Sequence, residues 1–155
     1  MKSIVAIIAL FAGSAAGSAS TIPDSELSLG GVALGDSETR VLAVLGQAAR
    51  QSDTGEGITL EYAGLTVLVG WLEPSVPGKQ RHVLQLNATG SNACTPSGVC
   101  PGMPVSKVVA AYGQPIKATR ESGSFLEFYS DQSSCWLQVR TSEDTIRSIS
   151  AVCQP

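Results

Sequence analysis

The sequence predicts an α+β fold made of two tandem repeats, each a short helix followed by a three-stranded antiparallel meander. The stretch GVALGDSETRVLAVLGQA at 31–48 returns as GVCPGMPVSKVVAAYGQP at 98–115, and such self-similarity marks a repeated structural unit. After each stretch come three runs in which apolar and polar residues alternate, the pattern of half-buried strands. We therefore place repeat 1 at 20–92 and repeat 2 at 93–155.

The first 19 residues, MKSIVAIIALFAGSAAGSA, predict a secretory signal peptide. Lys2 precedes an apolar run from Ile4 to Ala12, and small residues end the segment at Ala19, which is the order of a cleavable export signal. The apolar run is shorter than the roughly 20 residues that span a bilayer. No cysteine lies directly after this run, where bacterial lipoproteins carry the lipid, so lipid attachment is not expected. We predict a periplasmic or secreted protein without a transmembrane anchor.

Helix signals follow the shared glycines in both repeats. In repeat 1, Asp36 predicts an N-cap, Ser37–Leu45 a helix and Gly46 its end, because a residue with left-handed backbone commonly closes a helix. In repeat 2, Pro104 predicts the first helical position and Gly113 the end, since proline needs no hydrogen-bond partner there. Two different sets of residues thus predict the same short helix.

The expected strands are 58–62, 65–72 and 81–88 in repeat 1, and 125–129, 135–140 and 146–153 in repeat 2. A Pro-Gly turn at 76–79 predicts a register with Trp71 opposite Leu84 on the side that faces the helix. The other side of repeat 1 would then carry Thr59, Glu61, Thr66, Leu68, Leu72, Val83 and Gln85.

Four cysteines in an exported chain predict disulfides. The turn at 142–145 allows a register in which directly opposed residues lie about 4.5 Å apart at Cα, near the lower limit for a disulfide. We therefore pair Cys135 with Cys153 and, by remainder, Cys94 with Cys100. Because His82 is the only histidine, a zinc site is the poorer account. The register is Cys135 opposite Cys153, Leu137 opposite Ala151 and Val139 opposite Ile149.

The same register places six residues on the sheet face away from the helix. They are Phe125, Glu127, Tyr129, Trp136, Gln138 and Arg140. Aromatic residues and arginine are enriched at protein-binding hot spots, so we predict that this face binds another protein. The alternatives are packing between the two repeats, or a one-residue slip that would put these side chains in the core. Lost affinity in an intact Trp136→Ala variant would favour the binding face, whereas unfolding would favour the core.

No catalytic arrangement stands out. Acyl transfer needs a nucleophile and a base, but His82 lies beside Arg81 at a strand start with no Ser or Cys motif nearby. The acidic residues are scattered over turns and helix starts, and no pair is placed as a glycosidase requires. A formal charge of −3 without a basic stripe argues against nucleic acid. We predict no enzymatic activity, no metal and no cofactor.

The repeated pattern resembles the β-lactamase-inhibitor-protein-like (BLIP-like) superfamily, related to envelope proteins of the SmpA/OmlA type. The resemblance implies a layered fold in which two helix-plus-sheet repeats form one concave, aromatic-rich surface that grips an enzyme. The positions that carry it in repeat 1 are Gly31, Gly35, Ser37, Val41, Gly46, Gln47, Leu60 and Tyr62. Those in repeat 2 are Gly98, Gly102, Pro104, Val108, Gly113, Gln114, Pro115, Leu126 and Phe128.

The predicted function is an exported protein-binding module, a steric inhibitor or immunity-type protein that covers another protein, such as an enzyme in the periplasm or outside the cell. The alternative is a non-enzymatic envelope-assembly or cell-wall module of the SmpA/OmlA type, although this chain lacks the lipidated cysteine of those proteins. A small hydrolase with an unrecognised site is the third hypothesis.

Overall fold

The computed structural model describes residues 17–72 and 80–154. Within these ranges the helices are α1 (Glu38–Leu45) and α2 (Val105–Tyr112), preceded by a 3-10 turn at Asp24–Glu26. The strands are β1 (Ser28–Leu29), β2 (Val32–Ala33), β3 (Arg50–Thr54), β4 (Gly57–Tyr62), β5 (Leu65–Gly70), β6 (His82–Ala88), β7 (Ile116–Arg120), β8 (Gly123–Tyr129), β9 (Cys135–Ser142) and β10 (Thr145–Cys153). Of the predicted signal peptide, residues 1–16 lie outside the described residues.

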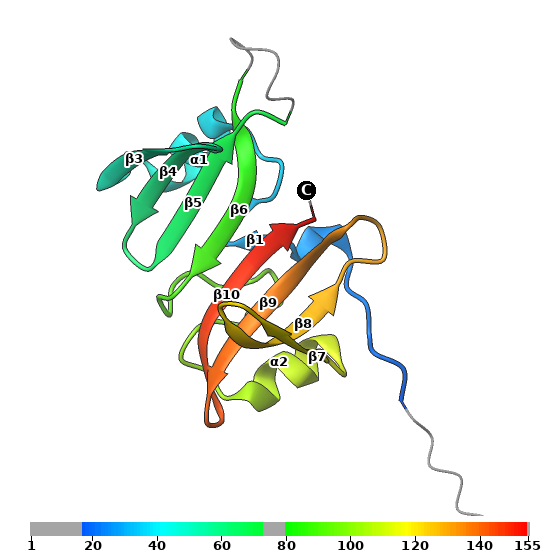
Figure 1. Cartoon of the computed structure of the whole chain (residues 1–155). Coiled ribbons are helices and arrows are strands. Elements are labelled where there is room, and N and C mark those ends of the chain that lie inside the picture. Colours follow the sequence, from blue (N-terminus) through cyan, green and yellow to red (C-terminus); the bar gives the residue numbers. More distant parts are fainter. Residues whose placement is uncertain (1–16, 73–79, 155) are drawn as a thin grey trace, which may run out of the picture.

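Eight strands form one antiparallel sheet in the order β3-β4-β5-β6-β10-β9-β8-β7 (Figure 1). The chain starts at one edge with β3 and reaches the centre with β6. It then starts again at the opposite edge with β7 and returns to the centre with β10. We call α1 with β3 to β6 half one, and α2 with β7 to β10 half two. Main-chain pairing of β6 with β10 joins the halves.

The predicted fold of two helix-plus-three-stranded repeats is wrong. Each helix is followed by four strands, and the strands of both halves belong to a single sheet. The sequence analysis missed the edge strands because all five residues of β3 and four of the five in β7 are exposed. Neither strand therefore carries the apolar alternation of a half-buried strand. The predicted division of the chain at residues 92 and 93 stays a prediction.

One hydrophobic core lies between the sheet and the two helices. Val41 of α1 and Val108 of α2 are fully buried, and both belong to the same cluster as the inward residues of the sheet. The β1–β2 hairpin adds Leu29 and Val32. Each such side chain contributes about 1.5–3 kcal/mol through burial. Because the cluster is continuous across both halves, the core holds the sheet as one unit.

The helices begin one residue later than predicted and end where predicted. Ser37, rather than Asp36, is the N-cap of α1, and its Oγ accepts a hydrogen bond from the Arg40 N–H at 3.1 Å. Gly46 and Gly113 follow the last residues of the helices with φ of 77° and 81°, a backbone conformation that favours glycine. The capping rules therefore locate both helices to within one residue.

The register predicted for half two and both predicted disulfides are confirmed. Cys135 lies opposite Cys153 and is bonded to it, and Cys94 is bonded to Cys100. Disulfides form and persist in oxidising compartments outside the cytoplasm. No helix in the described ranges is long and apolar enough to cross a membrane.

The register predicted for half one is wrong. Val69 pairs with Val83, after a register shift that follows Leu68 and leaves Leu84 as an extra residue. Such a bulge reverses the side-chain alternation beyond it, so Val83 is buried in the core instead of lying on the opposite face. The turn predicted at 76–79 lies outside the described residues.

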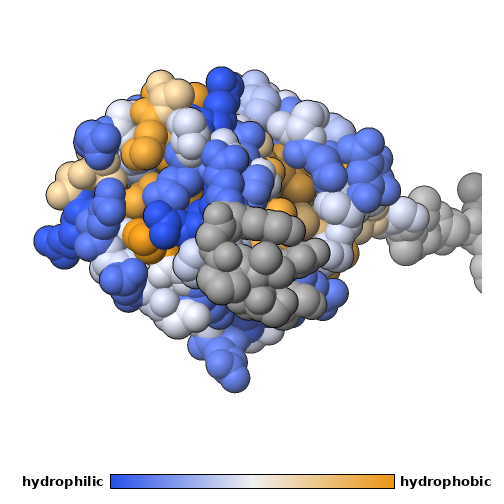
Figure 2. Space-filling model, turned by 90° about the horizontal axis from the view of Figure 1, so that it is seen from above, coloured by the Kyte–Doolittle hydropathy of each residue, from blue (hydrophilic) through white to orange (hydrophobic). Residues whose placement is uncertain are grey.

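Little apolar side-chain surface is exposed. The exposed large apolar residues in the described part of the chain are Val44, Leu72 and Ile116. On the face seen in Figure 2, orange apolar patches are separated by blue polar side chains. A partner that binds this protein is therefore expected to meet polar groups as well as apolar ones.

Candidate functional site

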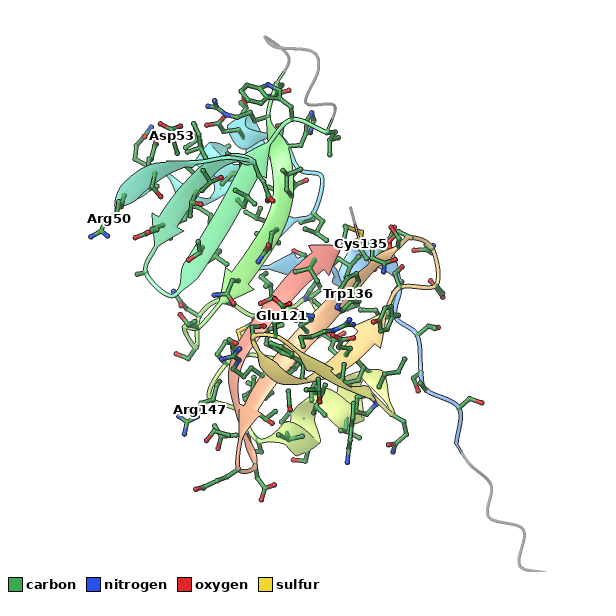
Figure 3. All side chains as sticks on the ribbon, viewed as in Figure 1. Arg50, Asp53, Glu121, Cys135, Trp136 and Arg147 are labelled. Carbon is green, nitrogen blue, oxygen red and sulfur yellow. A yellow bond between two sulfur atoms is a disulfide. The ribbon has the colours of Figure 1, made fainter. Side chains whose placement is uncertain are left out.

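A row of mostly polar side chains crosses all eight strands on the face of the sheet turned away from the helices. We call this the open face; Figure 3 labels Arg50 at its β3 edge and Trp136 in half two. Neighbouring strands lie about 4.8 Å apart, so residues paired in register form a continuous line. In order the row is Arg50, Glu61, Thr66, Asn87, Ser150, Gln138, Glu127 and Ile116.

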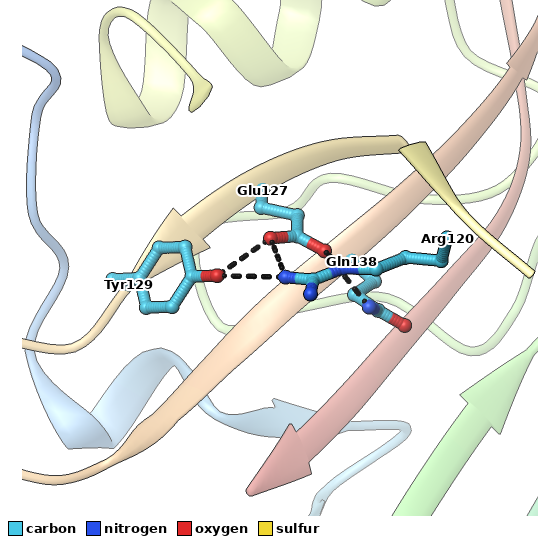
Figure 4. A network of polar contacts seen from close by, with 4 residues as sticks. All are labelled: Arg120, Glu127, Tyr129 and Gln138. Carbon is cyan, nitrogen blue, oxygen red and sulfur yellow. Dashed lines mark hydrogen bonds and ion pairs between the residues drawn. The ribbon is translucent and has the colours of Figure 1, made fainter. Parts of the chain in front are cut away.

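In half two the row is sealed by a charged network around Glu127 (Figure 4). Arg120 donates to both Glu127 carboxylate oxygens, at 3.0 and 2.7 Å. The Tyr129 hydroxyl and the Gln138 amide also donate to this carboxylate, at 2.7 and 2.9 Å. The Glu127 side chain is 0% exposed, whereas that of Arg120 is 44% exposed. A buried carboxylate is tolerated when its oxygens are hydrogen-bonded in this way.

The network holds each ionisable group in one protonation state. Burial alone would raise the pKa of Glu127, but the hydrogen bonds from Arg120, Tyr129 and Gln138 outweigh it and keep that pKa below its ordinary value. Burial, and then the nearby Glu127 carboxylate, raise the pKa of Tyr129. Neither group is poised to exchange a proton near neutral pH, as a general acid or base would be.

The aromatic rings of half two pack beneath the two arginines. Tyr129 and Trp136 stack with ring centroids 5.3 Å apart. The Arg120 guanidinium carbon lies 6.0 Å from the Trp136 centroid, and that of Arg140 lies 5.0 Å from the Phe125 centroid. Arg140 also donates to a backbone carbonyl of the β7–β8 turn, which crosses in front of the sheet in Figure 1. Arg120 and Arg140 therefore cover part of the Trp136 and Phe125 rings at this end of the sheet.

The structure brings together all six residues predicted as a binding site, but it leaves little of them accessible. Phe125 is 9%, Trp136 8% and Glu127 1% exposed. Phe125, Glu127 and Trp136 lie outside the core cluster that contains Val41 of α1 and Val108 of α2. Tyr129 and Gln138 are half-buried and Arg140 is exposed. That these six residues anchor a partner stays a prediction, and Arg140 is the member that a partner could reach directly.

In half one the open face forms a shallow groove of about 440 Å³. The β3–β4 turn makes one wall, fixed by hydrogen bonds from the N–H groups of Glu56 and Gly57 to Thr54 Oγ at 3.3 and 3.1 Å. Gly57 lies so close to β5 that a Cβ would come within 2.1 Å of the Val69 carbonyl oxygen. The lining residues are Thr54, Gly55, Glu56, Thr59, Thr66, Leu68, Gln85 and Asn87.

The groove exists because half one has small side chains where half two has large ones. In the row, Glu61 opposite Thr66 corresponds to the glutamate and glutamine of half two. At the next open-face pair, half one has Thr59 opposite Leu68. Half two has Phe125 beneath Arg140 at that place. A threonine and a leucine leave a hollow, whereas a phenylalanine and an arginine fill it.

Part of the groove and three of the four network residues, Glu127, Tyr129 and Gln138, were predicted from the sequence to lie on the open face, but the bonds between them were not. The predicted residues on this face in half one included Thr59, Thr66, Leu68 and Gln85, and all four line the groove. The wall and Arg120 were missed because both belong to the edge strands or their turns. Within the described ranges, no three His, Cys, Asp or Glu side chains are placed to hold a metal ion.

No family model matches the chain, and no curated protein matches its sequence. Solved structures are similar to it, including the following two. The chain matches a cysteine-rich secretory protein from Staphylococcus aureus subsp. aureus Mu50 with a TM-score of 0.54 and 13% identity over 86% of this chain and 49% of that one. An extracellular protein containing a SCP domain from Bacillus anthracis str. Ames matches with a TM-score of 0.46 and 12% identity, over 94% and 50%.

The chain spans about half the length of each of these structures. At 13% identity, the likeness to the Staphylococcus aureus protein is one of fold alone. It overturns the resemblance to the BLIP-like superfamily and to SmpA/OmlA-type proteins, because the fold is that found in a protein of another kind. The short glycine motifs of the sequence located the helices correctly but did not identify the family.

Proposed function

We propose that this chain is an exported, non-catalytic module that binds another protein on the open face of its sheet. The observation that carries the proposal is the polar row, which is sealed in half two and opens into a groove in half one. In this mechanism the partner is held sterically on a preformed surface. A rigid surface loses little conformational entropy when it binds.

The groove supports binding because its side chains retain unused hydrogen-bonding groups. In the described part of the chain, the side chains of Thr59, Thr66 and Gln85 form no hydrogen bond. Polar groups on a preformed surface fix the orientation of a partner and give specificity. Half two would serve as the stiff support beside this groove.

The ionisable groups of the open face support a binding role over catalysis. Glu127 forms an ion pair with Arg120 at 2.7 Å, and Glu61 forms one with Arg50 at 3.7 Å. A general acid or base needs a pKa near the working pH and a free approach to the reacting group. The Glu127 carboxylate has neither property.

Export is supported by the two disulfides and by the leader-like start of the chain. Cys94–Cys100 and Cys135–Cys153 use all four cysteines, as expected for a protein that works in an oxidising compartment. We propose that the mature protein acts in the periplasm or outside the cell, and that cleavage follows Ala19.

The test is affinity capture from periplasmic and culture fractions with three full-chain proteins. Gln85→Arg places a charged side chain in the groove, and Gln47→Arg makes the same change at an exposed position beside α1. We expect the natural chain and Gln47→Arg to retain the same partner, and Gln85→Arg to lose it with an unchanged melting temperature. Equal capture by all three proteins would contradict binding on the open face.

A further inference from the structure

We infer that the groove of half one binds an extended polypeptide segment of the partner, with a basic side chain of that segment at Glu56. This inference rests on the proposed protein-binding function and assigns the class of ligand and the half that recognises it. Three properties of the groove carry it: its unused hydrogen-bonding groups, the nature of its floor, and its charge.

The hydrogen-bonding groups match those of a peptide backbone. Asn87 Oδ1 accepts a bond from Ser150 Oγ at 2.9 Å, so the amide N–H groups of Asn87 remain as donors. Gln85 adds an amide, and Thr59 and Thr66 add hydroxyls, which both donate and accept. An extended chain offers one N–H and one C=O per residue. In half two the place of Thr66 is taken by Gln138, whose amide is already bonded to Glu127.

The floor and shape of the groove favour an extended segment over a compact ligand. Leu68 and the threonine methyl groups make part of the lining apolar, and alternate side chains of an extended segment point to one side. Sites for small molecules are concave clefts or cavities that bury most of the ligand. This groove is shallow, and its lining has no aromatic ring on which a saccharide could stack.

The charge of the groove favours a basic side chain. Glu56 lines the wall and forms no ion pair among the described residues, whereas the nearby Glu61 already has Arg50 at 3.7 Å. A lysine or arginine of the segment would complement the Glu56 carboxylate. Complementary charges at an interface mainly set specificity and the association rate.

The probe for the test is a phage-displayed library of random dodecapeptides, selected on the disulfide-bonded full chain. The counter-target is the double variant Thr59→Phe with Leu68→Arg, which gives half one the filling residues of half two. We expect enriched peptides to contain Lys or Arg, and to bind the counter-target at least tenfold more weakly by calorimetry. Glu56→Gln should weaken binding about threefold at low salt, whereas Glu121→Gln, at an exposed turn position, should not.

The inference is overturned if no peptide family is enriched, or if the selected peptides bind the counter-target equally well. It is also overturned if neutral oligosaccharides, rather than peptides, shift the NMR signals of the Gln85 and Asn87 amides. Circular dichroism and the melting temperature establish that the double variant is folded. If Gln85→Arg loses the captured partner while no peptide is selected, the segment assignment fails and the proposed function stands. If Gln85→Arg still captures the partner, the proposed function fails as well.

Discussion

Each half pairs a glutamate of its second strand with an arginine of its edge strand, but the arginines come from different positions and the two pairs differ in distance and exposure. Arg50 lies directly opposite Glu61, whereas Ile116 lies opposite Glu127 and Arg120 reaches that carboxylate from four residues further along β7. In half one, Arg50 and Glu61 lie 3.7 Å apart with side chains 74% and 42% exposed. In half two, Arg120 and Glu127 lie 2.7 Å apart, and the glutamate side chain is fully buried. The equivalent glutamates thus take part in a loose surface pair in half one and in a buried network in half two, depending on where the arginine lies and on the side chains around it.

The energetic consequences follow from that difference in burial. An exposed pair contributes about 0–1 kcal/mol, because water screens the charges and two long side chains are ordered. A buried carboxylate that lost its partners would be strongly unfavourable. Half two therefore depends on its intact network for part of its stability. In half one, substitutions on the open face should change the free energy of unfolding little. Residues on that face can therefore vary to suit a ligand without loss of the fold.

The largest expected effect is that of Trp136→Ala. The ring is 8% exposed and stacked on Tyr129, so its removal should lower the free energy of unfolding by about 3 kcal/mol. Leu68→Ala, on the floor of the half-one groove, should cost about 1 kcal/mol because that side chain is only half-buried. Urea unfolding followed by circular dichroism measures both values. If Trp136→Ala left the free energy of unfolding unchanged, the open face of half two would contribute no more to stability than that of half one.

The next effect is the loss of a disulfide. Replacing both Cys135 and Cys153 by serine opens a link between residues 18 apart in sequence, which corresponds to about 3 kcal/mol in the chain-entropy model. The same change at Cys94 and Cys100, only 6 apart, corresponds to about 2 kcal/mol. Thermal unfolding of the two double variants compares the links. If the Cys94 and Cys100 variant lost more stability than the Cys135 and Cys153 variant, loop length would not determine the contribution of the two disulfides.

The difference between the halves also explains what the sequence could predict. In half two, Leu137, Val139, Ile149 and Ala151 alternate and are paired as predicted, because the register shift of this strand pair lies beyond them, between Ile146 and Ser148. The alternation was therefore sufficient to fix the register and the Cys135–Cys153 disulfide. In half one the predicted register, with Trp71 opposite Leu84, is already two residues off at Val67, which pairs with Leu86, and the extra residue Leu84 shifts the pairing once more. No local residue pattern reveals either shift.

The edge strands and the network were beyond this kind of reasoning for another reason. β7 lies in a polar, exposed stretch, and Arg120 reaches Glu127 only because that strand pairs with β8. The burial of Glu127 depends on side chains contributed by three strands. A sequence pattern shows that a residue is on a face, but it does not show which neighbours cover that face. The single-sheet arrangement likewise depends on the pairing of β6 with β10.

Glu127→Gln tests the sealed network directly. The substitution keeps the size of the side chain but removes the charge that accepts bonds from Arg120, Tyr129 and Gln138. We expect the free energy of unfolding to fall by about 2 kcal/mol, measured by urea unfolding at pH 7. The rings beneath the arginines should also loosen, and the intrinsic fluorescence of Trp136 should shift. A variant as stable as the natural chain would show that the network contributes nothing to half two.

The same network predicts how stability depends on pH. Because the pKa of Glu127 is lowered by folding, its contribution is complete above the unfolded pKa of about 4.3 and is lost as the pH falls through the folded pKa. Hydrogen bonds from Ser130 and Ser133 also lower the pKa of Asp24, so both carboxylates weaken the fold in acid. Glu127→Gln should flatten the fall in melting temperature below pH 5. An identical acid profile in natural and variant chains would contradict the assigned direction.

The smallest effect should come from Glu61→Gln, the matched change in half one. Its carboxylate is 42% exposed and its arginine partner 74% exposed, so we expect a change in unfolding free energy within about 0.5 kcal/mol. Raising the salt concentration should reduce even that difference, since screening acts on exposed charges. Urea unfolding at 0.05 and 0.5 M salt measures it. If Glu61→Gln destabilised the chain as much as Glu127→Gln, half one would depend on its open-face pair as half two does, and it would lack the freedom on which the groove assignment depends.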